Sequence, residues 1–129
     1  MNRYKLAKFG EDITVQYLTN NNYQILERNF HSIYGEIDII CQKNRQLVFV
    51  EVKTRRSNRF GEALAAITNQ KKDKIIRAAY EYIAKKDIEI SMRFDVVTIK
   101  FIKKDNNYAF DHIKNAFFAD NYSSKFSSK

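Results

Sequence analysis

Residues 35–55 read GEIDIICQKNRQLVFVEVKTR, which is two runs rich in Ile, Val and Phe on either side of the polar segment 43–46. Apolar, β-branched runs bounded by a short polar turn are typical of two strands joined as a β-hairpin. We therefore expect strands over residues 36–42 and 47–53. The turn fixes how the two strands pair, and so determines which of their side chains share a face.

The length of this turn predicts a specific pairing. If the loop is even-numbered and centred on residues 44–45, counting back along both strands places Asp38 opposite Glu51. The same count places Glu36 opposite Lys53, so these side chains share one face. An odd-numbered loop or a β-bulge would instead separate Asp38 and Glu51 onto different faces.

Asp38 and Glu51 are then two like charges in direct opposition. Such a pair destabilises a sheet unless one carboxyl keeps its proton or a cation lies between them. Carboxylates on a sheet, completed by water and phosphate oxygens, are the usual ligands of Mg²⁺. On hairpin geometry alone, a solvated acidic edge with surface ion pairs to Lys53 remains the alternative.

Outward from this hairpin, the apolar periodicity predicts the other elements. Residues 4–20 repeat apolar side chains at three- and four-residue spacing, which indicates a helix, and residues 23–30 read as a strand. A helix is expected over 61–86 and a long strand over 90–101. Because a helix precedes this strand, it is expected to pair parallel with one of the earlier strands. Residues 108–118 are ambiguous between a short strand and a helical turn.

The chain is long enough for one domain. It has 129 residues, of which 44% are hydrophobic and 29% charged, enough apolar content to form a core. We expect a single domain over residues 1–118 and a disordered tail, rich in Ser and Lys, over 119–129. The order helix, three strands, helix, strand predicts an α/β fold around a mixed sheet.

Composition excludes several classes of protein. Three scattered glycines cannot form a dinucleotide fingerprint or a Walker loop, and one cysteine with two histidines cannot build a zinc cluster or an intrachain disulfide. Cys41 shares the predicted strand face of Ile37 and Ile39, opposite Asp38, and is expected to be a buried, inert thiol.

With no apolar run near the roughly 18 residues of a membrane span, we expect a cytoplasmic protein with no membrane partner. His112 is expected to be structural or exposed.

Positive charge is concentrated in one part of the chain. The formal net charge is +8, and residues 53–77 carry eight Lys and Arg against two acidic residues. An excess of this kind favours a polyanionic partner, either nucleic acid or an acidic membrane surface. The chain shows no basic amphipathic helix with bulky exposed apolar residues, which argues against the membrane.

Several motifs together resemble a known family. The hairpin carries a D…ExK pattern, GEID at 35–38 and VFVEVKTR at 48–55, with the only acid-x-Lys triplet of the sequence. The match continues through Gly10-Glu11, Phe60-Gly61, Lys71, RFDVV at 93–97 and NAF at 115–117. It resembles the YraN-like proteins, which are similar to archaeal Holliday-junction resolvases in the restriction-endonuclease-like PD-(D/E)XK superfamily. Ile37 stands where the superfamily pattern has proline.

This resemblance implies a fold and a set of catalytic roles. The fold is a restriction-endonuclease-like mixed central sheet with helices on both faces, forming an endonuclease-like domain over residues 1–118. Asp38 and Glu51 would hold Mg²⁺ or Mn²⁺, and Lys53 would orient or deprotonate the attacking water. Glu11, at the edge of the apolar stripe of its helix, would complete the metal shell directly or through water. Its alternative is a surface glutamate near Lys8.

The implied activity is a divalent-metal-dependent nuclease that hydrolyses DNA phosphodiester bonds at branched or single-stranded structures. A non-catalytic nucleic-acid-binding module that keeps the nuclease fold is the alternative. Resolvase-like relatives often act as dimers, so a homodimer is a further expectation. The phosphate-binding candidates are basic residues after the catalytic strand and on the following helix, for several of which a solvated basic face remains the alternative. They are Arg55, Arg56, Arg59, Lys71, Lys74 and Arg77.

Overall fold

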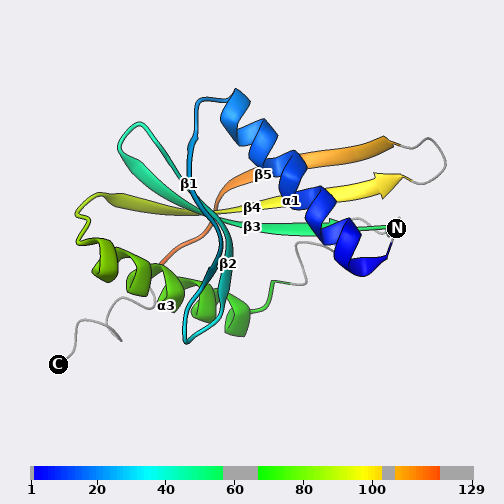
Figure 1. The fold of residues 1–129 in the computed structure, drawn as a ribbon. Coiled ribbons are helices and arrows are strands. Elements are labelled where there is room, and N and C mark those ends of the chain that lie inside the picture. The colour runs from blue at the N-terminus through cyan, green and yellow to red at the C-terminus, as the bar shows by residue number, and fades with distance from the viewer. Residues whose placement is uncertain (1, 57–66, 103–106, 120–129) are drawn as a thin grey trace.

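The computed structural model describes residues 2–56, 67–102 and 107–119 (Figure 1). Their elements, in chain order, are α1 (Arg3–Asn20), β1 (Gln24–His31), β2 (Glu36–Lys43), β3 (Gln46–Arg55), α3 (Asn69–Lys86), β4 (Ser91–Ile102) and β5 (Asn107–Phe117). Arg59, residues 61–66 of the expected helix and residues 120–129 of the expected tail lie outside the described residues. Within the described ranges, neither helix has the length and apolar content needed to span a membrane.

The strands form one five-stranded sheet in the order β1-β2-β3-β4-β5. Only the β3–β4 pair is parallel, and the other three pairs are antiparallel. Helix α3 lies in the connection between β3 and β4, as the pairing of two parallel strands requires. The predicted α/β fold with a mixed sheet is confirmed, as is the parallel pairing of the strand expected over 90–101.

The two helices cover opposite faces of the sheet (Figure 1). On one face Leu18 of α1 packs in a buried cluster with Val48 and Val50 of β3. On the other, residues of α3 such as Ile76 form a cluster with Phe49. Side chains of β3 therefore alternate regularly between the helices, and this alternation carries Glu51 to the side of α3.

The predicted hairpin register is confirmed. Strands β2 and β3 pair from Lys43–Gln46 to Ile39–Val50, which is the register that the even-numbered loop predicts. The two central turn residues, Asn44 and Arg45, have φ of 50° and 63°. Two consecutive left-handed residues are typical of a type I′ turn, whose twist matches that of the paired strands.

Strand β2 departs from regular alternation at Asp38. Cys41 and Ile39 lie in the cluster on the side of α1, but Ile37 packs on the side of α3, so its predicted face is wrong. On β1, Asn29 lies between Arg28 and Phe30, which pair with Ile39 and Ile37, and its φ of 51° shows that the backbone is irregular at this level. Cys41 is fully buried, and burial raises the pKa of its thiol to about 12, as expected of an inert cysteine.

Two other element predictions are refined by the structure. Helix α3 begins only at Asn69, because the Thr68 side chain caps it by accepting a hydrogen bond from the Lys71 N–H at 3.1 Å. Residues 67–68 are therefore not helical, although the prediction placed them inside a helix, and the predicted start at 61 lies outside the described residues. The ambiguous segment 108–118 is a strand, β5, which pairs antiparallel with β4.

A buried polar network holds β4, β5 and α1 together. Asp95, which is fully buried, accepts hydrogen bonds from Arg93, from the His112 ring and from the Asn115 N–H. Burial would raise the pKa of Asp95, but these donors lower it below its ordinary value. The hydroxyl of Tyr17 on α1 lies 3.1 Å from His112 Nδ1. His112 is therefore structural, one of the two expectations for it.

Gly10 lets α1 approach the end of β3. A Cβ on Gly10 would clash with Oγ1 of Thr54 on β3, so any side chain there would push the helix from the sheet. Thr54 is buried, and its hydroxyl has no hydrogen-bond partner among the described residues. The close approach places the next residue, Glu11, over the end of β3, where the candidate site lies.

We expect Gly10→Ala to destabilise the protein by about 1 to 3 kcal/mol, because an inserted methyl group overpacks this contact. In an unconstrained helix the same change would stabilise by roughly 1 kcal/mol. Urea unfolding of wild type, Gly10→Ala, Thr54→Ala and the double variant measures the coupling. Because Thr54→Ala removes the clashing oxygen, the double variant should lose less stability than the sum of the single variants. A Gly10→Ala protein as stable as wild type would contradict the contact.

Candidate active site

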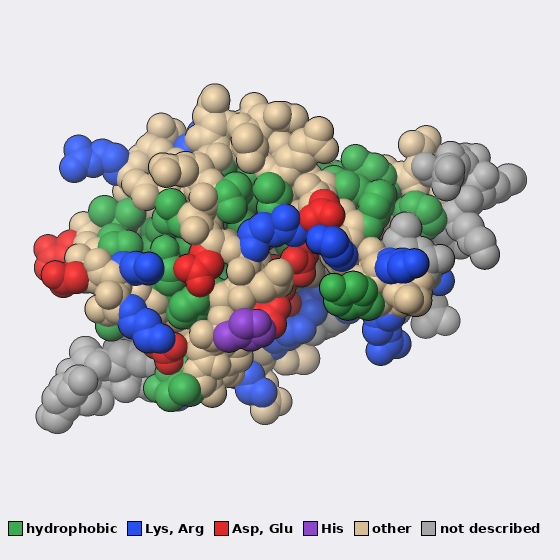
Figure 2. All heavy atoms as spheres, in the orientation of Figure 1, with side chains coloured by type: hydrophobic (Ala, Val, Ile, Leu, Met, Phe, Trp, Pro, Cys, Tyr) green, Lys and Arg blue, Asp and Glu red, His purple; other side chains and the backbone are tan. Residues whose placement is uncertain are grey.

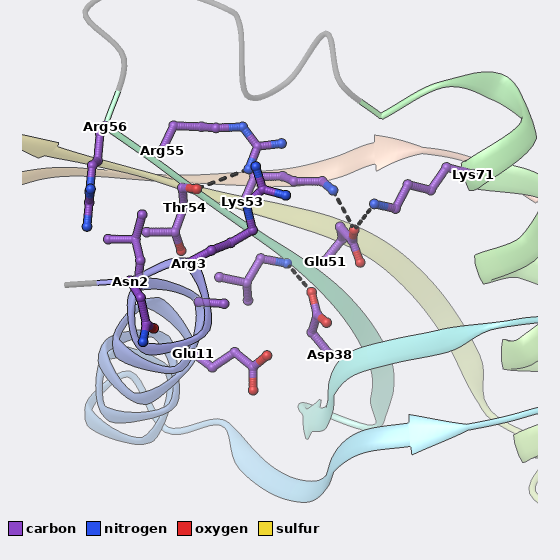
Figure 3. Close-up of a pocket in the computed structure, with 13 residues that line it drawn as sticks. Asn2, Arg3, Glu11, Asp38, Glu51, Lys53, Thr54, Arg55, Arg56 and Lys71 are labelled. Atoms are coloured by element: carbon purple, nitrogen blue, oxygen red, sulfur yellow. Dashed lines mark hydrogen bonds and ion pairs between the residues drawn. The ribbon is translucent and has the colours of Figure 1, made fainter.

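A pocket of about 680 Å³ lies at the end of β3, between the beginnings of α1 and α3 (Figure 3). Its wall combines acidic and basic side chains with a few apolar ones from both sides of the sheet. The lining residues are Asn2, Arg3, Leu6, Ala7, Glu11, Asp38, Glu51, Val52, Lys53, Thr54, Arg55, Arg56 and Lys71. All four predicted catalytic residues, Glu11, Asp38, Glu51 and Lys53, line this one pocket.

Asp38 lies where β2 separates from β3. The backbone ladder between the two strands ends at the Ile39–Val50 pair, and beyond it the Asp38 side chain accepts the Val52 N–H at 2.8 Å. This hydrogen bond fixes the carboxyl group of Asp38 at the edge of β3. The separation of the strands thereby leaves room for the pocket without leaving the Val52 donor unpaired.

The carboxyl groups of Asp38 and Glu51 interact closely. Burial and the charge of Glu51 raise the pKa of Asp38 to about 8, although the Val52 hydrogen bond opposes the shift. Two carboxylates held together in a buried place cannot both ionise without a positive charge beside them. The predicted conflict between Asp38 and Glu51 is therefore present in the structure.

Two lysines supply positive charge to Glu51. Nζ of Lys53 lies 3.2 Å and Nζ of Lys71 lies 3.3 Å from the same oxygen, Glu51 Oε2 (Figure 3). The Lys53 and Glu51 side chains are only 9% and 6% exposed, whereas that of Lys71 is 44% exposed. Burial, together with the neighbouring Lys71, lowers the pKa of Lys53 below its ordinary value. Lys53 is thus a buried amine rather than an ordinary surface lysine.

The expected pairing of Glu36 with Lys53 is wrong. Because the β2–β3 ladder ends at Ile39–Val50, Glu36 has already left β3 and pairs with β1. Its Oε2 lies 3.3 Å from Nδ1 of His31. Glu36 therefore lies outside the pocket lining, and Lys53 contacts Glu51 instead.

Glu11 reaches the pocket from α1 but does not join the other carboxyl groups directly. Among the residues that the structure describes, no three Asp, Glu, His or Cys side chains converge as a metal-ligand set. Glu11 Oε1 lies 3.7 Å from Nη2 of Arg28, and burial raises the pKa of Glu11. Glu11 is not a surface glutamate near Lys8, because its side chain is only 16% exposed and faces Arg28, while Lys8 pairs with Asp12 at 3.7 Å.

The predicted phosphate-binding residues fall into three groups. Arg55 and Arg56 line the pocket, Lys71 lines it and contacts Glu51, and the remaining two described residues lie further along α3. Lys74 is exposed beside Gly35, and Arg77 pairs with Asp73 at 2.9 Å. On the face shown in Figure 2, basic side chains of the described residues are interspersed with acidic ones.

Sequence reasoning missed the contribution of the N-terminal end of α1. Asn2 and Arg3 line the pocket next to Arg55 and Arg56 (Figure 3). Residues 3, 7 and 11 follow one another at four-residue spacing, which places them on one face of a helix. That spacing, counted back from Glu11, is the pattern that would have found Arg3.

The chain is an α/β protein with a mixed five-stranded sheet, which is consistent with a restriction-endonuclease-like fold. Its pocket holds two acidic residues beside a buried lysine. Residues 10–99 match the family model described as "Uncharacterised protein family UPF0102". The chain therefore belongs to the UPF0102 family, which bears out the resemblance to the YraN-like proteins at the level of the family.

Individual relatives cover most of both chains. A UPF0102 protein of Syntrophomonas wolfei is 47% identical over 120 residues, 91% of this chain and 100% of the relative. One of Persephonella marina is 46% identical over 115 residues, 88% of this chain and 94% of the relative. One of Clostridium beijerinckii is 41% identical over 113 residues, 87% and 92% of the two chains.

The raised pKa of Asp38 predicts a loss of stability with rising pH in the absence of divalent cations. The folded state holds the Asp38 proton until about pH 8, whereas the unfolded state releases it near 3.8. The contribution of Asp38 to the free energy of unfolding is therefore greatest below pH 4, falls as the pH rises, and is lost above pH 8. Since Asp38 is not fully buried, we expect a contribution of roughly 2 to 4 kcal/mol rather than the full value of the shift.

Urea unfolding in EDTA at pH 5 and pH 8 tests this expectation. Asp38→Asn should unfold at higher urea than wild type at pH 8, and the difference should shrink at pH 5. Asp12→Asn is the matched control, because Arg28 lowers the pKa of this exposed carboxyl and the change should not reproduce the effect. If the stability of Asp38→Asn depends on pH as that of wild type does, ionisation of Asp38 does not destabilise the folded protein, which would contradict the expectation.

Proposed function

We propose that this chain is a divalent-metal-dependent nuclease that hydrolyses phosphodiester bonds in DNA, at branched or single-stranded structures. One observation carries the proposal: Asp38 and Glu51 lie together beside buried Lys53, in a pocket also lined by arginines. The D…ExK resemblance to the PD-(D/E)XK nucleases supports it, because the pattern residues come from the adjacent strands β2 and β3 and line one pocket.

The donor set fits Mg²⁺ or Mn²⁺. Such cations prefer carboxylate and water oxygens, and a divalent charge would relieve the opposition between the two carboxyl groups. Asp38 and Glu51 would hold the ion, with Glu11 acting through water since it does not converge with them. When bound, a divalent ion polarises the scissile phosphate and lowers the pKa of an attacking water.

Lys53 is the proposed group for handling the proton of that water. The amine must be neutral to accept a proton, and burial favours the neutral form by lowering the pKa of Lys53. Its position at the end of a core strand, 3.2 Å from Glu51 Oε2, holds it at a defined place in the pocket. As an ammonium it would stabilise negative charge that develops on the phosphate.

The arginines are proposed to position the nucleic-acid backbone. Arg3, Arg55 and Arg56 line the pocket, where their guanidinium groups would contact phosphates on either side of the reacting one. Contacts of this kind fix register and orientation but read no base sequence. Lys74 and Arg77 would extend the contact along α3.

We expect the purified protein to cleave junction, flap or linear DNA with Mg²⁺ or Mn²⁺ and to lose this activity in EDTA. Asp38→Asn and Lys53→Met should each lower the cleavage rate about 100-fold or more, since the first removes a proposed metal ligand and the second removes the proposed proton acceptor. Asp12→Asn, a change of the same chemistry outside the pocket lining, should cleave like wild type. Gel-based cleavage assays under single-turnover conditions measure these rates.

Cleavage that persists in both Asp38→Asn and Lys53→Met would contradict the assignment and indicate a contaminating nuclease. The pairing of Glu51 with two lysines favours a second candidate, a nucleic-acid-binding module, because it neutralises Glu51 without a metal. Salt-sensitive DNA binding with no metal-dependent cleavage of any substrate would support that module instead.

A further inference from the structure

One carboxylate oxygen in the pocket is shared by cations from two different elements. Glu51 Oε2 lies 3.2 Å from Nζ of Lys53 on its own strand and 3.3 Å from Nζ of Lys71 on α3. The contact with Lys71 joins a residue at the end of β3 to the first turn of a helix on the same face. Both ammonium groups thus approach the position in which a cation bound to Glu51 would lie.

The two lysines differ in how freely their ammonium groups can move away from Glu51. Lys53 is 9% exposed and enclosed at the end of a core strand, whereas the Lys71 side chain is 44% exposed. The backbone of Lys71 is fixed, since its N–H donates to the capping Thr68 side chain. Its flexible four-carbon stem can therefore swing while the helix stays in place.

Lys71 differs in this respect from the lysine that follows it. Nζ of Lys72 lies over the Phe117 ring, 5.8 Å from its centroid, on a different part of the surface. Among the lysines that the structure describes on α3, Lys71 alone forms an ion pair with Glu51 and lines the pocket. Lys72 therefore offers a matched control with the same charge on the same helix.

We propose that Lys71 is a displaceable counter-ion. It neutralises Glu51 in the metal-free protein, and when a divalent cation binds, its side chain moves away from Glu51 and forms an ion pair with a DNA phosphate. This positioning role rests on the proposed function. A divalent cation at the carboxyl pair repels both ammonium groups, and only that of Lys71 is exposed enough to move. The released ammonium lies at the pocket wall, where a bound phosphate would receive it.

Displacement has two thermodynamic consequences. Lys71 competes with the metal for Glu51, so it weakens metal binding in the absence of DNA. Because the metal frees Lys71 for a phosphate, metal and DNA strengthen each other's binding by the same factor. A static salt bridge between Lys71 and Glu51 would add nothing to the coupling that a direct contact between metal and phosphate produces.

The test measures Mn²⁺ binding to the full chain without DNA, by isothermal titration calorimetry, for wild type, Lys71→Met, Lys71→Arg and Lys72→Met. Lys71→Met should bind Mn²⁺ about fivefold or more tightly than wild type, a typical size for such coupling. Lys71→Arg, which keeps the cation, should remain near wild type. Lys72→Met should change the affinity less than twofold, which separates displacement from a general loss of positive charge.

A second arm measures junction-DNA binding in EDTA and in Ca²⁺, which occupies carboxylate sites. The gain in DNA affinity on adding Ca²⁺ should be at least about threefold smaller in Lys71→Met than in wild type. Equal Mn²⁺ affinity in wild type and Lys71→Met, or an equal gain with Ca²⁺, overturns this inference alone. If neither protein takes up Mn²⁺, the inference and the proposed function are both overturned.

Discussion

The opposition of two carboxyl groups, Asp38 and Glu51, is the constraint on which the site depends. Both are acidic groups taken largely out of water, and burial, together with the charge of Glu51, raises the pKa of Asp38 to about 8. A folded protein tolerates such a pair only with a proton, a positively charged neighbour or a bound cation. In this structure Lys53 and Lys71 supply the neighbouring charge. The same electrostatic demand makes the pair suited to a divalent metal.

The fold serves this constraint from both faces of the sheet. The tight turn after β2 sets the register of β2 and β3. Counted from that turn, the ladder ends at the Ile39–Val50 pair, so the strands separate at Asp38, whose side chain accepts a hydrogen bond from the Val52 N–H. Gly10 lets α1 lie against the end of β3 and bring Glu11 to the pocket. On the other face, the capped start of α3 presents Lys71 to Glu51.

Local rules explain what the sequence predicts well. Turn length and alternation are properties of neighbouring residues, and they predicted the β2–β3 register, the proximity of Asp38 to Glu51 and the buried thiol of Cys41. The partner of Glu36 was wrong because the ladder stops at Ile39–Val50, which no local pattern shows. The Lys71–Glu51 contact depends on how α3 docks on the sheet, so it required the structure, whereas helical spacing from Glu11 would have indicated Arg3.

The most direct measurement is an anomalous difference map from crystals grown with Mn²⁺, for wild type and Asp38→Asn. We expect one peak in wild type, bound by the Asp38 and Glu51 carboxylates, with no peak there in the variant. Wild-type crystals at saturating Mn²⁺ that show no peak between these residues would contradict the proposed metal site. Carboxyl groups that point to opposite faces of the sheet would contradict it equally.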